Sequence, residues 1–334
     1  DGPSGRLWRA IRCVAGAVGV VGLRYVGVGL RFVVVLYALH LVGVAPNMTA
    51  YNALAHGFST LPTGGFSPEA DSIAAFSPVV QWAFVPFMVL AGVNFALFWY
   101  VFRDEVDALV ENTEFRVYLG AVVAMSGVLV AALYRGGAPP TELGGVTEGV
   151  AGTALRQGVF QIASLLNSTG FATADFAQWE THTQFLLLFA MFIGGSAGST
   201  GGGIKVIRWL ILVKTLRREL YTTANPDVVR PVRLGGSVVD EDVVRGILTF
   251  TLLYLLLFAL AAVFIELDTA RAGTPLSGTE AAAASLATIG NIGPGLGPLG
   301  PVGSYEFLPN TTQLPMVFLL WIGRLERVPV LELF

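Results

Sequence analysis

Charged residues are scarce in this chain. They make up 13% of its 334 residues, whereas hydrophobic residues make up 54% and the mean hydropathy is +0.68. An ordinary soluble domain carries about 25% charged residues, so the composition excludes that class and predicts a membrane-embedded protein. The length leaves room for six or seven spanning helices of roughly 20 residues each, plus loops.

Cysteine and histidine are also rare. The single cysteine, Cys13, excludes a disulfide framework or a cysteine metal site within the chain. The net charge is −3 and there is no basic stripe, so we expect no nucleic-acid partner. The N-terminus is polar, and no A-x-A-like site separates it from the first apolar run, so we expect no cleavable signal peptide.

Two enzyme motifs can be set aside. Residues 194–198 fit G-x-S-x-G, but a hydrolase elbow needs a preceding strand and a later histidine, and His40, His56 and His182 all come earlier. Residues 201–205 lack the Gly-Lys-Ser/Thr of a Walker A loop. We therefore predict that the chain is not an enzyme and holds no organic cofactor.

Long apolar runs alternate with short apolar helices that are too brief to cross a bilayer. The spans are expected within residues 14–44, 79–102, 115–134, 243–267 and 314–334, and an interrupted span resumes at 185–193. The short helices are expected at 49–59, 153–166 and 279–287. The fold class is therefore all-α and membrane-integral. One unit occurs three times along the chain, and it consists of a span, a short helix, a glycine-containing turn and a second span.

The resulting organisation has five parts. They are a cytosolic linker at 1–12, a unit at 13–102, a unit with a broken inner helix at 103–216, a cytosolic loop at 217–242 and a unit at 243–334.

The turns after the short helices contain Gly64, Gly170 and Gly290, which lie roughly 110 to 120 residues apart. Backbone carbonyls can replace the hydration shell of a monovalent cation without a buried charge. Carbonyls that point at an axis need a local positive φ, which glycine permits. Thr63, Thr169 and Thr288 come before these glycines and could add a ligand. The alternative to an ion-binding role is that these turns are loops that only reverse the chain direction.

The predicted ion filter consists of the following residues: Pro62, Thr63, Gly64, Gly65, Ser168, Thr169, Gly170, Phe171, Thr288, Ile289, Gly290, Asn291 and Ile292. The short helices end at these turns, so the negative ends of their dipoles would favour a cation there.

A second break, at residues 194–203, interrupts apolar sequence with glycine, serine and threonine. Irregular backbone at membrane depth is tolerated only against protein or a water-filled path. The segment is therefore predicted to be a movable gate between filter and cytosol, and the alternative is a kink without a role. The predicted gate residues are Gly194, Gly195, Ser196, Gly198, Ser199, Thr200, Gly201, Gly202, Gly203 and Arg324.

The distribution of basic residues predicts the orientation. With the three turns outside, the clusters at 6–12, 103–116, 205–245 and 324–327 all lie inside, and Arg135, Arg156 and Arg271 fall outside. This arrangement follows the positive-inside rule. The chain is thus expected to be a multi-pass protein of the cell membrane.

At this point the residues resemble a known family. Residues 63–67, 168–173, 194–208 and 290–295 are similar to the pore subunits of the Trk/Ktr/HKT superfamily of cation transporters, closest to its TrkH branch. The most specific motif is Gly-Ser-Thr-Gly-Gly-Gly-Ile-Lys-Val-Ile-Arg at 198–208. The resemblance covers nearly the whole chain.

This resemblance implies uptake of potassium, or sodium, through a pore of four span–loop–span repeats. It also implies a homodimer on a cytosolic, TrkA-like nucleotide-binding regulatory subunit. It places a mobile intramembrane loop just below the filter, contacted by an arginine of the last helix that matches Arg324. The three units here match the second, third and fourth repeats, so we expect a fragment or an incomplete gene product that need not conduct alone.

Several residues keep a second interpretation. Arg324 could instead be an interfacial anchor paired with Glu326, and the sequence favours Lys205 and Arg208 as membrane anchors over a role in the ion path. His56 could be a packing residue rather than a ligand. Asp71 and Asp175 could be solvated loop charges rather than groups that concentrate cations at the outer mouth. For the whole chain, the alternatives are an ion-coupled secondary transporter with broken helices and a non-conducting regulatory or assembly subunit.

Overall fold

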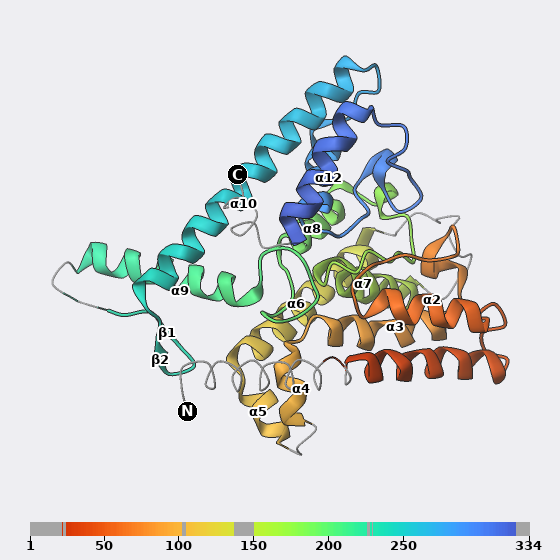
Figure 1. Ribbon diagram of the computed structural model, residues 1–334, viewed down its shortest axis with the longest axis horizontal. Helices are drawn as coiled ribbons and strands as arrows, with labels where there is room; N and C mark the ends of the chain where they lie inside the picture. Colours follow the sequence, from red (N-terminus) through yellow and green to blue (C-terminus); the bar gives the residue numbers. More distant parts are fainter. Residues whose placement is uncertain are drawn as a thin grey trace, which may run out of the picture.

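The computed structural model describes residues 22, 25–101, 105–136, 150–225, 228 and 230–324. Within these ranges the chain is helical, apart from one short antiparallel hairpin and the connecting turns (Figure 1). The linker expected at 1–12 and the proposed partner Glu326 lie outside the described residues.

The first third begins with an apolar helix at Tyr25–Leu41. It continues through α2 (Ala50–Thr60), a 3-10 turn η1 (Ser72–Ala75), α3 (Pro78–Ala91) and α4 (Phe95–Val101). Helix α2 is the short helix that the sequence predicts, and its N-terminus is capped by the Thr49 hydroxyl, which accepts from the Asn52 N–H.

The span predicted at 79–102 is not one helix. Gly92 ends α3, and the Asn94 side chain accepts from the Ala96 N–H at 2.9 Å as α4 begins. The carbonyl of Gly92 instead accepts from the N–H of Ser196, at 2.8 Å. The break therefore gives the 194–203 segment a backbone partner on the neighbouring unit, a long-range contact that apolar patterning does not reveal.

The middle third contains α5 (Val106–Glu111), α6 (Thr113–Gly136), α7 (Val150–Leu166), a 3-10 turn η2 (Phe176–Gln178), α8 (Thr181–Phe192) and α9 (Val206–Ala224). Helix α7 lies in the middle of the molecule (Figure 1). Its C-terminal half is enclosed on all sides, with Phe160, Ile162 and Leu165 completely buried.

The last third contains the hairpin β1 (Arg233–Leu234) and β2 (Ser237–Val238), then α10 (Glu241–Arg271), α11 (Gly278–Ile289), a 3-10 turn η3 (Gly297–Leu299) and α12 (Asn310–Arg324). Ser277 and Glu280 form a reciprocal capping box that starts α11. Helices α7, α10 and α11 confirm the helices that the sequence predicts at 153–166, 243–267 and 279–287, with ends that differ by a few residues.

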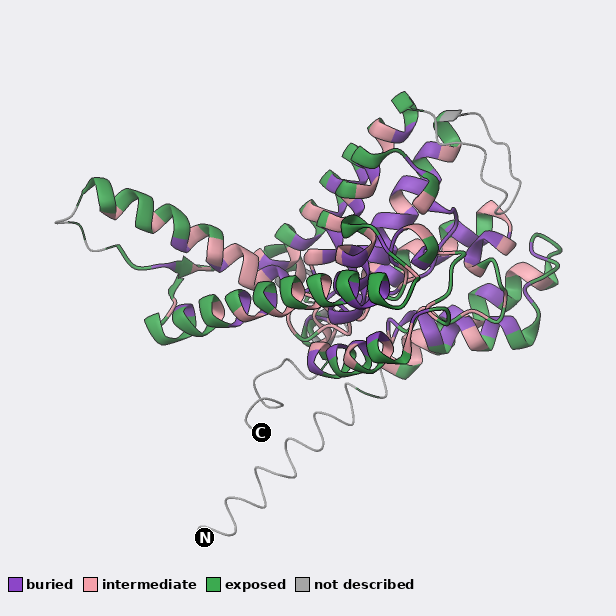
Figure 2. Ribbon diagram, turned by 90° about the horizontal axis from the view of Figure 1, so that it is seen from above, coloured by how far each residue is buried: buried purple, intermediate pink, exposed green. Residues whose placement is uncertain are grey.

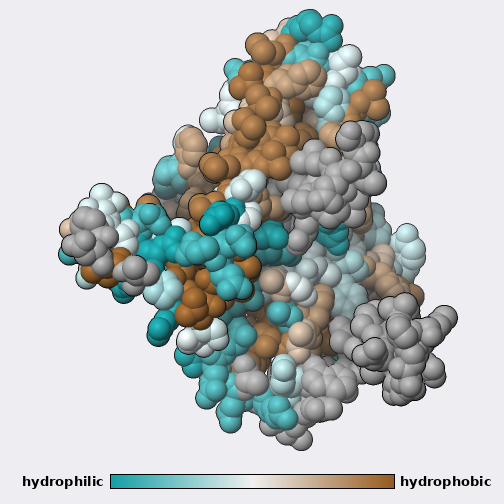
Figure 3. All heavy atoms as spheres, turned by 60° about the vertical axis from the view of Figure 1, so that its left-hand side comes forward, coloured by the Kyte–Doolittle hydropathy of each residue, from teal (hydrophilic) through white to brown (hydrophobic). Residues whose placement is uncertain are grey.

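Helices α6 and α10 are long and apolar enough to cross a membrane, with mean hydropathies of 2.1 and 2.6. Helix α10 leaves Leu252, Leu256 and Leu260 more than half exposed, one turn apart on the same face. Apolar atoms gather over the upper part of the molecule, where α10 and α12 lie (Figure 3). An apolar outer surface of this kind is suited to contact with lipid.

The buried residues concentrate around α7 and the ends of its neighbours, whereas α9 and the lower part of α10 project outward and are largely exposed (Figure 2). The main core joins side chains of α6, α7, α8, α10 and α11. This packing fixes the ends of α7 and α11, and a second cluster that joins α2, α3 and α7 fixes α2.

Candidate functional site

The three short helices end in turns with the same hydrogen-bond geometry. The N–H groups of Gly64, Thr169 and Ile292 each donate to the carbonyl five residues earlier, in all three cases at 2.8 Å. The shared pattern makes these three positions equivalent, although their side chains have nothing in common.

Each turn also contains two residues with positive φ, on either side of that position. The first is Thr63 (56°), Ser168 (53°) or Asn291 (53°). A non-glycine residue in this region is strained, and such strain is concentrated at functional sites.

The second positive-φ residue is a glycine: Gly65 (68°), Gly170 (85°) or Gly293 (105°). The expectation that Gly64 and Gly290 adopt positive φ is therefore wrong, although that for Gly170 is right. Gly290 has φ −81° and closes the last turn of α11. Because a helix-closing glycine and a turn glycine look alike in sequence, the register of the first and third turns could not be read from composition.

The second glycine is where neighbouring turns touch. A methyl group built on Gly65 would overlap the carbonyl oxygen of Thr169, and one built on Gly170 would overlap the carbonyl oxygen of Ile292. A methyl group on Gly293 would meet no described atom within 4 Å. The three turns thus follow one another, and the glycines of the first two each admit the equivalent carbonyl of the next turn.

The threonines of the predicted filter differ from one another. The Thr63 hydroxyl lies 2.6 Å from the Pro62 carbonyl and 3.0 Å from the Thr200 carbonyl. The Thr169 hydroxyl is buried without a hydrogen-bond partner among the described residues. Thr288 lies within α11 and its hydroxyl donates to the Ala284 carbonyl, so it braces the helix rather than the turn.

Behind the first two turns lies an aromatic cluster. The ring of Phe171 packs against Phe84 at 5.4 Å and against His56 at 5.8 Å between centroids. His56 is fully buried, and its ring nitrogens bond to the Asn52 carbonyl and the Ser67 hydroxyl. Burial lowers the pKa of His56 below its usual value. The structure therefore supports packing as the role of His56.

The segment 194–203 lies against all three turns. The Thr200 hydroxyl donates to the Leu61 carbonyl at 2.8 Å, and the Gly202 N–H donates to the Ser168 hydroxyl. A methyl group on Gly202 would overlap the Gly290 carbonyl oxygen. The structure thus brings the residues predicted for the filter and those predicted for the gate into direct contact.

The ends of this segment are tied together. Ile193 and Ile204 form an isolated parallel bridge, and the Gly194 N–H donates to the Ile204 carbonyl at 2.8 Å. Gly198 and Gly203 adopt positive φ values of 71° and 69°, which allow the chain to reverse. The result is a closed loop with a narrow base, here called the intramembrane loop (residues 194–203).

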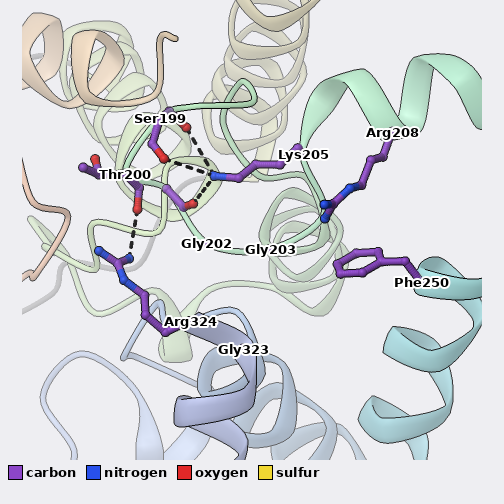
Figure 4. Close-up of a pocket in the computed structure, with 10 residues that line it drawn as sticks. Ser199, Thr200, Gly202, Gly203, Lys205, Arg208, Phe250, Gly323 and Arg324 are labelled. Carbon is purple, nitrogen blue, oxygen red and sulfur yellow. Dashed lines mark hydrogen bonds between the residues drawn. The ribbon is translucent and has the colours of Figure 1, made fainter. Parts of the chain in front are cut away.

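Cationic side chains hold the other side of the loop (Figure 4). Arg324 donates to the Thr200 carbonyl at 2.9 Å, and the Lys205 ammonium donates to the carbonyls of Ser199 and Gly201. The Arg208 guanidinium lies 3.8 Å from the centre of the Phe250 ring. Arg324 thus makes the loop contact expected of it. Lys205 is only 7% exposed, an environment unlike that of a membrane anchor.

These groups line a cavity of about 280 Å³ between the loop, α9, α10 and α12, and none of the described lining residues is acidic. A passing cation would meet the positive charges of Lys205, Arg208 and Arg324 on this side, and backbone oxygens on the other.

Three polar residues of the site were missed from sequence. The Tyr118 hydroxyl lies 2.8 Å from both the Val89 carbonyl and the Asn167 side-chain oxygen. Glu114 accepts from the Ala197 N–H at 2.6 Å. Tyr118 stands in an apolar run, which was an available signal, but Glu114 has Glu111, Asn112 and Arg116 beside it and resembles the end of a charged link. Asp175, in contrast, is an η2 cap that binds Ala177 and Gln178.

The fold and the site define a helical membrane protein with three successive backbone turns above a glycine-rich loop. Comparison with known proteins agrees: the family described as "TrkH: Cation transport protein" matches residues 5–117 and 140–334. The chain belongs to this family.

Individual relatives point the same way. The chain is 31% identical over 296 residues to the Trk system potassium uptake protein TrkH of Salmonella typhimurium, and 32% identical over 290 residues to TrkG of Escherichia coli K12. Each alignment covers 86% of this chain but 56% of the relative, so the chain spans little more than half the length of these proteins.

Among solved structures, the potassium transporter TrkH from Vibrio parahaemolyticus is similar, with a TM-score of 0.83 and 29% sequence identity. The match covers 96% of this chain and 64% of that protein. The fold is therefore that of a membrane transporter. The matched proteins are named as uptake proteins and not as enzymes.

Proposed function

We propose that this chain supplies three of the four repeats that surround a pore through which potassium enters the cell. The observation that carries the proposal is the succession of turns: Gly65 faces the carbonyl of Thr169, and Gly170 faces the carbonyl of Ile292. Equivalent backbone oxygens arranged one after another about an axis can replace the water around a dehydrated monovalent cation. The relatives named as potassium uptake proteins favour potassium as that ion.

The fourth repeat would lie beside Gly293. This glycine has the conformation of Gly65 and Gly170, yet no described atom lies where a neighbouring carbonyl would be expected. A further span–loop–span unit in the complete protein would fill that place. In the proposal the three turns lie outside, the long basic loop lies in the cytosol, and a homodimer assembles on a cytosolic nucleotide-binding subunit.

The intramembrane loop is the proposed gate. It lies directly against the turns: hydrogen bonds of Thr200 and Gly202 hold it to the first two, and Gly202 packs against the Gly290 carbonyl at the third. Its carbonyls at 199–201 are engaged by Lys205 and Arg324, whose charges oppose a cation on the same path. A displaced loop would open the path, and the membrane potential would drive potassium inward with roughly 2.3 kcal/mol per charge per 100 mV.

The test is potassium flux through the complete gene product in proteoliposomes. We expect Gly170→Ala to abolish flux or its preference for potassium over sodium. The matched control is Gly120→Ala, because a methyl group at Gly120 in α6 meets no described atom within 4 Å. Unchanged flux and selectivity in folded Gly170→Ala protein would refute the filter assignment. Flux coupled to protons or sodium would favour a secondary transporter, and absence of flux would favour a regulatory subunit.

A further inference from the structure

The base of the intramembrane loop contains a buried carboxylate that belongs to another part of the chain. Glu114 stands in the first turn of α6, about 80 residues before the loop, and is only 8% exposed. Its Oε1 accepts from the N–H of Ala197, at 2.6 Å. The backbone N–H of Ile207, in the first turn of α9, faces the same carboxylate. One side chain therefore binds the first half of the loop and lies against the helix that follows it.

The start of α9 leaves a place for such an acceptor. The N–H of Val206 donates to the Gly195 carbonyl at 3.1 Å, but Ile207, the next residue, has no helical carbonyl one turn earlier to receive its N–H. The N-cap residue is Lys205, whose side chain makes no capping bond. A carboxylate at a helix N-terminus supplies that acceptor and complements the helix dipole. Hydrogen bonds to an ionised acceptor are about twice as strong as neutral ones.

The opposite charge holds the middle of the loop. The Lys205 ammonium donates to the carbonyls of Ser199 and Gly201, and Glu114 lies close enough to Lys205 to interact with its charge. The carboxylate thus binds the N–H of Ala197, just before residues 198–203, and the ammonium binds carbonyls within them. With both ends and the middle fixed, the loop remains against the turns.

We propose that Glu114 is a positioning residue that holds the intramembrane loop in its closed place, so that the stability of the closed gate is set from α6. The proposal rests on the proposed function of the loop as a gate. It adds that release of the Ala197 N–H from the Glu114 carboxylate is the local event of opening.

The direct readout is the accessibility of the loop to a thiol reagent. Cys13 is the single cysteine of these 334 residues, so Cys13→Ser, together with serine at any cysteine elsewhere in the complete gene product, gives a silent background in which Ser199→Cys is the reporter. The labelling rate would be measured with a charged methanethiosulfonate on the complete gene product in inside-out vesicles. Potassium flux would be measured on the same preparations.

We expect Glu114→Gln to raise the labelling rate of Ser199→Cys about tenfold, since the charge-assisted bond from the Ala197 N–H is lost. Glu114→Asp keeps the charge but is one methylene shorter, so a smaller increase is expected. The matched control is Glu111→Gln: Glu111 is an exposed carboxylate at the end of α5, and its loss should leave the rate unchanged.

The outcomes separate the two ideas. A labelling rate in folded Glu114→Gln protein within twofold of the parent overturns the proposal. If Glu114→Gln does not fold, an unchanged rate in Glu114→Asp has the same meaning. Faster labelling with unchanged flux would keep Glu114 as the loop anchor but remove the loop as the gate. Faster labelling in a protein without any flux would reject the proposed function alone.

Discussion

Replacing the second glycine of each turn by alanine should have unequal effects. Gly170 and Gly293 share a positive φ, so in both cases the new side chain costs about 1–2 kcal/mol in backbone conformation. At Gly170 the added methyl group also overlaps the Ile292 carbonyl oxygen, whereas at Gly293 it meets no described atom. Overpacking of this kind costs about 1–3 kcal/mol. The chain of residues 1–334 should therefore tolerate Gly293→Ala better than Gly170→Ala, by that amount.

The comparison becomes sharper in the complete gene product. If another segment completes the ring beside Gly293, its carbonyl should meet the methyl group there as Ile292 does at Gly170. Gly293→Ala should then lose its advantage in thermal stability in detergent and should impair potassium flux as strongly as Gly170→Ala. Gly120→Ala, in α6, serves as the control in both proteins.

Two results would refute this reasoning. Equal destabilisation by Gly170→Ala and Gly293→Ala in the chain of residues 1–334 would mean that the carbonyl contact at Gly170 contributes nothing. A persistent difference between them in the complete protein would mean that no equivalent carbonyl approaches Gly293.

Three further perturbations test neighbouring parts of the site. Thr200→Val removes the hydroxyl bonds to two carbonyls and should loosen the loop, raising potassium flux severalfold; unchanged or lower flux in folded protein would contradict the gate assignment. Tyr118→Phe leaves the buried side-chain oxygen of Asn167 without its donor and should lower the free energy of unfolding by about 1–3 kcal/mol, measured by thermal unfolding. Tyr134→Phe, at an exposed site, should leave the free energy of unfolding almost unchanged. Equal losses in the two variants would contradict a stabilising bond from Tyr118 to Asn167. Burial lowers the pKa of His56, so its neutral form stabilises the fold above about pH 6.5 and that stability is lost as the pH falls below this value. His56→Gln should flatten the decline in melting temperature below pH 6.5, whereas His182→Gln should not; an unchanged slope in His56→Gln would contradict this.

The helical architecture could be predicted because its causes are local. The short helices α2, α7 and α11 are largely apolar segments, of which α2 and α11 begin with side-chain caps, and the glycine-containing turns that end all three stand out against the flanking sequence. The family was recognised from the motif at 198–208, which also located the intramembrane loop.

The register of the turns and the break in the second span had non-local causes. Gly65, rather than Gly64, admits the carbonyl of a neighbouring turn, and Gly293, rather than Gly290, has the equivalent positive φ. The sequence does not indicate which glycine will take this place in the turn. Likewise, Gly92 ends α3 where its carbonyl receives the Ser196 N–H, about 100 residues later. The role of Glu114 depends on the same kind of long-range contact.

The central claim is that equivalent carbonyls of successive turns hold a dehydrated cation. The most direct measurement is anomalous scattering from crystals of the complete gene product grown with thallium or rubidium in place of potassium. We predict a peak on the axis beside the carbonyl oxygens of Thr169 and Ile292, weakened in Gly170→Ala protein. A well-diffracting crystal with no anomalous peak at these oxygens, or with its peaks only elsewhere, would contradict the account.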